Sequence, residues 1–197
     1  MNNGIQVIYP RTKYSTLNKE IYLFIQKQIL NFMNVAKEAI QENIIYTLDI
    51  SHDEYFYQNY LSFVFYSSCY IGGAHPEHNV SCFVYDINQD KLVYISDFIQ
   101  EIPNLLEILS KESRKKLAAN ANITNLSMML EGTKPIISNF SHFVLAPTGI
   151  MIFFPEYQVA PYSSGAFKVV IPYSIVFHKE KDSNYSLLDY LLLLLCN

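Results

Sequence analysis

Apolar residues recur every three or four positions along the first long segment of the chain. Between residues 17 and 41 they occur at Leu17, Ile21, Phe24, Ile25, Phe32, Val35, Ala36, Ala39 and Ile40, with lysines, glutamines and asparagines between them. These spacings align on one stripe of a helix. The pattern predicts an amphipathic helix over residues 17–41 that packs on a sheet. An apolar stretch stopped by Pro10 predicts a short strand before this helix.

From residue 44 the period changes to runs of aromatic and β-branched residues, which are typical of strands. The runs cover residues 46–50, 60–70, 80–86 and 92–95, and short turn clusters at 72–76 and 88–90 separate the last three. Strands joined by short turns predict an antiparallel meander.

The second half of the chain combines one helical pattern with further strand patterns. Pro103 can begin a helix, apolar residues follow it at helical spacing, and a cationic group at residues 111–116 favours the C-terminal end of that helix. Residues 120–135 are expected to be irregular or weakly helical. Apolar runs at 140–145, 150–154 and 167–172 predict three strands. The apolar tail at 187–195 predicts a short helix or a segment that faces a partner.

These patterns predict an α+β fold: an antiparallel sheet with a long N-terminal amphipathic helix and a second helix packed on it. We expect a single domain over residues 1–197. Residues 1–60 would form the helix-containing part, 61–177 the sheet-rich part and 178–197 a variable tail.

Composition excludes several classes of protein. Of the 197 residues, 50% are hydrophobic and 16% are charged, which excludes intrinsic disorder. The net charge of −4 and the absence of an extended basic stretch argue against nucleic acid as a partner. No apolar run approaches the roughly 18 residues that span a membrane, and no secretory signal is recognisable at the N-terminus.

Side chains that could take part in catalysis or bind a metal are scattered along the sequence. Two imidazoles, His75 and His78, lie three residues apart with Glu77 between them, but Pro76 argues against a helix that would align them. A polar hairpin tip is the simpler interpretation, and we expect no metal site, cofactor or catalytic residue. The alternative is a small hydrolase or metal-dependent enzyme that uses His75, His78 and Glu156.

The three cysteines cannot form a fully paired disulfide framework because their number is odd. Cys69 and Cys82 lie on either side of the 72–77 turn. A hairpin centred near His75 and Pro76 would place them opposite each other, within reach of a disulfide in an oxidising compartment. In a reducing compartment they would remain two thiols. Cys196 has no evident mate.

Two stretches together resemble a known family. The first is Tyr-Ile-Gly-Gly-Ala-His-Pro at 70–76, followed by a turn at 86–88, a strand at 92–95 and Ser-Asp-Phe-Ile at 96–99. The second runs from Gly149 to Gly165 and is followed by Val-Val-Ile-Pro-Tyr at 169–173. This chain resembles the extracytoplasmic domain of the anti-sigma factor RsiV, a domain of unknown function also found beside the deacetylase module of PdaC-type envelope proteins. The similarity extends from about Ile5 to Phe177.

This resemblance implies a bacterial domain that works outside the cytoplasm as a binding module and not as an enzyme. The anti-sigma member of the family recognises lysozyme. This chain departs from it, because the sequence contains neither a cytoplasmic segment nor a membrane helix. The region after His178 has no clear family counterpart.

The two motifs have features of a binding surface. Paired glycines permit a positive φ and a tight exposed turn. Prolines stiffen the second loop, and its tyrosines provide contact area at low entropic cost. Alternatively, this loop folds inward and its tyrosines complete the core. We expect both turns to meet at one end of the sheet, with ligand-binding residues Gly72, Gly73, His75, Pro155, Tyr157, Pro161 and Tyr162.

The expected function is therefore that of a non-catalytic, extracytoplasmic binding domain. Its ligand would be a cell-envelope protein such as a lysozyme-like muramidase, or a peptidoglycan glycan. Besides the enzyme alternative, a structural oligomerisation module that uses the 187–195 tail remains open.

Overall fold

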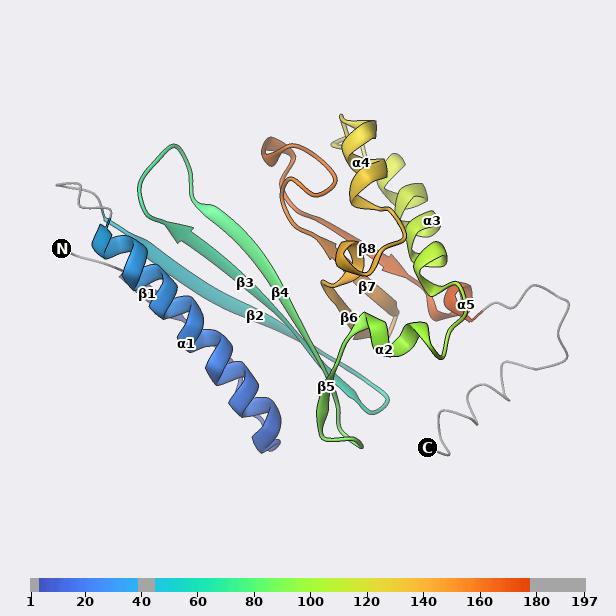
Figure 1. Ribbon diagram of the computed structural model, residues 1–197, viewed down its shortest axis with the longest axis horizontal. Coiled ribbons are helices and arrows are strands. Elements are labelled where there is room, and N and C mark those ends of the chain that lie inside the picture. The colour runs from blue at the N-terminus through green and yellow to red at the C-terminus, as the bar shows by residue number, and fades with distance from the viewer. Residues whose placement is uncertain (1–3, 39–44, 178–197) are drawn as a thin grey trace, which may run out of the picture.

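Two sheets form the centre of the molecule. A computed structural model describes residues 4–38 and 45–177 (Figure 1). The first sheet has the order β1-β2-β3-β4-β5 and the second the order β6-β7-β8. Their strands are β1 (Gly4–Val7), β2 (Thr47–Tyr57), β3 (Tyr60–Tyr70), β4 (Glu77–Asp86), β5 (Lys91–Val93), β6 (Phe143–Ala146), β7 (Gly149–Phe154) and β8 (Phe167–Ile171). The pairs are antiparallel except that β1 runs parallel to β2.

Helices precede, separate and follow these groups of strands along the chain. They are α1 (Ser15–Glu38), α2 (Ile95–Ile99), α3 (Leu105–Ala118), α4 (Leu126–Gly132) and α5 (Tyr173–Val176), with short 3-10 helices η1 (Ile137–Phe140) and η2 (Tyr162–Ser164). The predicted α+β class and long N-terminal helix are confirmed. Residues 39–41 of the predicted helix and the predicted tail segment at 187–195 lie outside the described residues.

The elements stack in four layers: α1, the first sheet, the second sheet, and a layer that contains α3 (Figure 1). Buried residues of α1 such as Leu17 and Ile21 pack on Phe63 and Phe65 of the first sheet. On the far side of the second sheet, α3 packs on β7 and β8, with Leu109 among the buried residues. Val64, Val144, Ala146, Met151 and Phe153 fill the space between the two sheets. Because successive side chains of a strand point to opposite faces, β3 packs on α1 with one face and on the second sheet with the other.

The division into two sheets was not apparent from the strand pattern. The second helix of the sequence analysis, α3, packs on the second sheet and not on the sheet that α1 covers. The second strand is also longer than predicted: β2 continues to Tyr57, because its polar residues pair along the whole length of β3. Gln58, with φ 52°, closes this hairpin.

The predicted placement of Cys69 opposite Cys82 across the hairpin is wrong. The β3–β4 hairpin is centred on residue 73, so that Cys69 pairs with Glu77 and Cys82 with Val64. Val64 and Cys69 are five positions apart on β3, and residues an odd number apart point to opposite faces. Cys69 packs in the core beneath α1, whereas Cys82 packs between the sheets. Burial raises the pKa of both thiols.

Within the described ranges, every helix is too short or too polar to cross a membrane.

Candidate functional site

The 72–78 turn and the 155–165 loop are in direct contact. The Tyr162 hydroxyl donates a hydrogen bond to the carbonyl oxygen of Pro76, at 2.9 Å. The His75 ring stacks on the Tyr162 ring, with 3.9 Å between centroids and 22° between planes. Tyr157 extends this group, with its ring centroid 5.7 Å from that of Tyr162. We call His75, Tyr157 and Tyr162 the aromatic patch.

The glycine pair supplies the shape of the first turn. Gly72 and Gly73 have φ values of 92° and 99°, a region that side chains with a Cβ atom avoid. The backbone therefore turns tightly between β3 and β4, and Gly73, Ala74 and His75 are exposed at its tip.

The second loop turns its aromatic residues outward. Tyr157 is 61% exposed, whereas Val159 and Ala160 are buried and seal the core in its place. Tyr157 also has φ 67°, an unusual and costly backbone conformation for a residue other than glycine. The inward-folding alternative is therefore wrong for Tyr157. Tyr162 is half-buried, as are Pro155 and Pro161.

A short network of hydrogen bonds anchors this loop to α4 and η1. The Gln158 amide nitrogen donates to the carbonyl oxygens of Gly132, at 2.9 Å, and Asn139, at 3.0 Å. Gly132 approaches the loop so closely that an added Cβ atom would lie 2.0 Å from the Gln158 carbonyl oxygen. The C-terminal end of α4 and η1 thus hold the backbone beside Tyr157.

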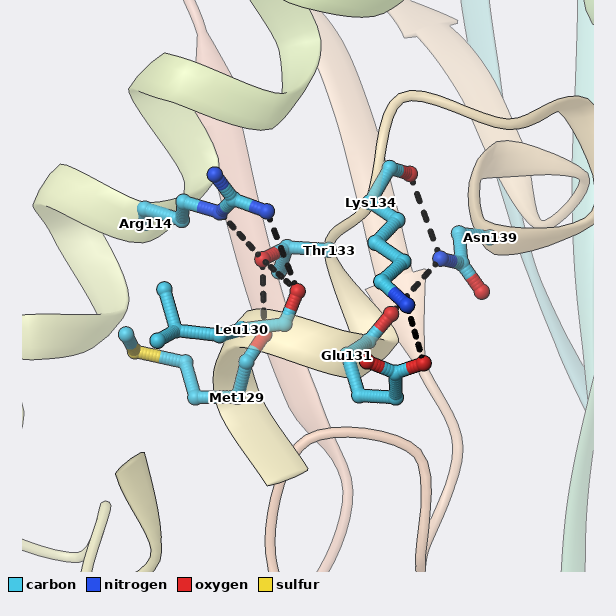
Figure 2. Close-up of polar contacts among 7 residues, drawn as sticks. All are labelled: Arg114, Met129, Leu130, Glu131, Thr133, Lys134 and Asn139. Atoms are coloured by element: carbon cyan, nitrogen blue, oxygen red, sulfur yellow. Dashed lines mark hydrogen bonds and ion pairs between the residues drawn. The ribbon is translucent and has the colours of Figure 1, made fainter. Parts of the chain in front are cut away.

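The C-terminal end of α4 is in turn held by α3 (Figure 2). The Arg114 guanidinium donates to the Thr133 hydroxyl oxygen at 2.9 Å and to the Leu130 carbonyl oxygen at 3.0 Å. The buried Thr133 hydroxyl donates to the Met129 carbonyl oxygen at 2.6 Å. A cation at this position also suits the negative end of the helix dipole.

The turn after α4 has its own polar contacts. The Asn139 amide nitrogen donates to the carbonyl oxygens of Glu131, at 3.0 Å, and Lys134, at 3.2 Å (Figure 2). Glu131 and Lys134 form an exposed ion pair. These contacts position Asn139, whose own carbonyl oxygen accepts from Gln158.

A groove of about 520 Å³ opens between the two sheets beside the aromatic patch. Its lining includes Asp49, Tyr66, His78, Glu156 and Lys168. Partial burial and the negative charge of Glu156 raise the pKa of the Tyr162 phenol, and burial and the hydrogen bond to Asp53 raise that of Tyr66. Both phenols are therefore neutral hydrogen-bonding groups at physiological pH.

The structure separates the residues of the predicted enzyme alternative. His78 and Glu156 line the same groove, whereas His75 does not line it and stacks on Tyr162. Among the described residues, no group of three His, Cys, Asp or Glu side chains is arranged to hold a metal ion.

Sequence reasoning located the two turns but missed the groove and the network that anchors the loop. The alternation of β2 carried a partial signal, because Asp49, Ser51 and Asp53 occupy every second position. The network had no sequence signal, since Arg114, Gly132, Asn139 and Gln158 are brought together only by the packing of α3, α4 and η1.

The domain is an α-β-β-α sandwich whose candidate binding surface is built from two turns. Comparison with known proteins shows which of them it resembles. Residues 89–174 match the family model described as "Protein of unknown function (DUF3298)". The chain is 28% identical over 174 residues to the Bacillus subtilis protein named peptidoglycan-N-acetylmuramic acid deacetylase PdaC. This alignment covers 86% of the chain but 37% of the relative's length. Residues 89–174 are thus similar to the DUF3298 family, and most of the chain is similar in sequence to part of PdaC.

A solved structure supports the fold. A DUF3298 family member from Bacteroides fragilis superposes with a TM-score of 0.53 at 18% identity, covering 85% of this chain and 69% of that one. A DUF3298 family protein from Pseudomonas aeruginosa has a TM-score of 0.46 at 17% identity and covers 66% of this chain and 60% of its own.

These comparisons confirm the PdaC-type resemblance, while the more specific likeness to RsiV stays a prediction. They contradict the prediction that the chain is not an enzyme, because the curated relative is named as a deacetylase.

Proposed function

We propose that this chain is an extracytoplasmic, envelope-associated domain that binds peptidoglycan through the aromatic patch. The observation that carries this proposal is the position of Tyr157, which is 61% exposed, in a left-handed backbone conformation and next to the His75–Tyr162 stack. A strained, exposed aromatic residue on an anchored loop is typical of binding sites.

The chemistry of the patch suits a glycan. A sugar ring presents a face of C–H groups that packs on an aromatic ring, and a phenol hydroxyl can hydrogen-bond to sugar hydroxyls. The Tyr162 hydroxyl is occupied by Pro76, so Tyr157 would provide both the ring and the hydroxyl to the ligand. Because Gln158 anchors the loop before any ligand arrives, less conformational entropy is lost on binding.

The comparison with PdaC favours peptidoglycan among the envelope ligands. Peptidoglycan appears in the name of that relative, and 86% of this chain aligns with it. The same similarity supports an envelope location, which belongs to the same proposal.

Sedimentation with insoluble peptidoglycan tests this function. We expect Tyr157→Ala to weaken binding about tenfold, because exposed tyrosines at the centre of a contact commonly contribute this much. Tyr94→Ala is the matched control: Tyr94 is 62% exposed but lines a different pocket, next to α1. Thermal melting of each variant checks that the fold is intact.

Two results would count against the proposal. One is a wild-type protein that stays in the supernatant, and the other is an equal loss for Tyr94→Ala and Tyr157→Ala. Capture by immobilised lysozyme without retention on peptidoglycan would also overturn it, in favour of the lysozyme-like muramidase as the ligand.

A further inference from the structure

A row of polar side chains crosses the first sheet at the groove. Gln6 pairs with Asp49, Asp49 with Ser68, and Ser68 with His78, so that one residue from each of β1, β2, β3 and β4 stands in line. Directly paired residues share a face of a sheet. All four line the groove.

The next row on the same face marks where the two sheets make contact. Ser51 pairs with Tyr66, and Tyr66 with Val80. Tyr66 packs edge-on against Phe153 of the second sheet, at 6.3 Å between ring centroids. The polar row therefore forms one wall of the groove, and the apolar contact between the sheets closes its inner end.

The second sheet contributes charges of both signs to the opposite wall. Lys168 pairs with Phe153, which packs between the sheets, so Lys168 faces the first sheet. Glu156 follows β7 and lines the same groove. Among the described residues, neither of them, nor Asp49, takes part in an ion pair or a side-chain hydrogen bond. The groove thus presents one ammonium and two carboxylates that remain available to a ligand.

Two residues that line the groove are close neighbours in the chain of residues at the aromatic patch. Glu156 directly precedes Tyr157, and His78 lies two residues after Pro76, whose carbonyl oxygen accepts from Tyr162. A ligand that covers Tyr157 and is long enough would therefore extend into the groove.

We propose that the groove binds the short peptide branch of a peptidoglycan strand whose sugar lies on the aromatic patch. This inference rests on the proposed function. A peptide branch carries amide groups, carboxylates and an amino group. Gln6, Ser68 and His78 can hydrogen-bond to the amides, Lys168 can pair with a carboxylate, and Asp49 and Glu156 can pair with an amino group. A sugar alone would leave these charges without a partner.

Titration calorimetry with two soluble probes tests the inference. One probe is the N-acetylglucosaminyl-N-acetylmuramyl-tripeptide released from peptidoglycan, and the other is tetra-N-acetylchitotetraose, which has no peptide. We expect Lys168→Gln to weaken binding of the disaccharide-tripeptide about tenfold, because a charge-assisted hydrogen bond is lost. Binding of chitotetraose should change less than twofold. Lys91→Gln is the matched control: Lys91 is an exposed residue of the edge strand β5, and its substitution should change the binding of neither probe.

Each outcome separates the inference from the proposed function. If the disaccharide-tripeptide binds no more tightly than chitotetraose, or if Lys168→Gln affects both probes equally, the groove does not bind the peptide, and the function of the aromatic patch stands. If neither probe binds the wild-type protein, both proposals fail. Both proposals are supported if Tyr157→Ala weakens the binding of both probes and Lys168→Gln weakens the binding of the disaccharide-tripeptide alone.

Discussion

Gly132→Ala should destabilise the protein by about 2 kcal/mol, because the new methyl group overpacks a site that has no room for it. Its Cβ atom would lie 2.0 Å from the carbonyl oxygen and 2.7 Å from the carbonyl carbon of Gln158. Both are backbone atoms of an anchored loop and cannot rotate away. The gain in helix propensity from glycine to alanine is at most about 1 kcal/mol, so the clash dominates. The thermal midpoint should fall by about 4–8 °C.

This substitution should also weaken peptidoglycan binding, because the loop must move to accept the methyl group and Tyr157 moves with it. Gly4→Ala is a suitable control, since its Cβ atom would meet Thr47 at 3.7 Å, an ordinary contact. We expect that variant to melt within about 2 °C of the wild type. An unchanged midpoint for Gly132→Ala would mean that the α4 end and the loop are not packed as described.

Thr133→Val should cost about 2 kcal/mol even though the two side chains have the same shape. Thr133 is fully buried, and its hydroxyl accepts from the Arg114 guanidinium and donates to the Met129 carbonyl oxygen. Valine lacks this hydroxyl, so Arg114 and the Met129 carbonyl oxygen each lose a hydrogen bond. A buried polar group without a partner costs about 1–3 kcal/mol of stability. Urea denaturation should show a lower midpoint with an unchanged m-value.

Thr133→Ser separates the hydrogen bonds from the packing. Serine keeps the hydroxyl and loses one methyl group, so we expect a loss of about 1 kcal/mol. Equal losses for serine and valine would contradict the assigned role of the hydroxyl. Because Arg114 and Thr133 act on the loop only through α4 and Gln158, Thr133→Val should reduce peptidoglycan binding less than Tyr157→Ala does.

Local periodicity predicted much of the fold. The stripe that includes Leu17, Ile21 and Ile25 predicted α1, because apolar residues spaced three or four apart lie on one face of a helix and can be buried together. Aromatic and β-branched runs likewise predicted β3 and β4. The polar second half of β2 was missed because acidic residues such as Asp53 and Glu54 have low strand propensity. This segment is extended because it pairs with β3.

The candidate site was predicted in part for the same reason. Glycines at 72 and 73 and prolines at 155 and 161 constrain the backbone locally, so their effect can be recognised in the sequence. The placement of the two cysteines across the hairpin was misjudged because a shift of the hairpin centre from residues 75–76 to 73 changes every cross-strand partner. Sequence spacing does not determine that register with the accuracy that a disulfide requires.

The amino-acid sequence by itself determined the α+β class, the long amphipathic helix and the two stiff turns, because these depend on interactions between residues close in the chain. Only the tertiary structure decided that the strands divide into two sheets, that Tyr162 reaches Pro76, and that Gln6, Asp49, Ser68 and His78 align along one groove. These features join residues up to 86 positions apart. Their contacts depend on strand register and on the packing of layers, which no local pattern specifies.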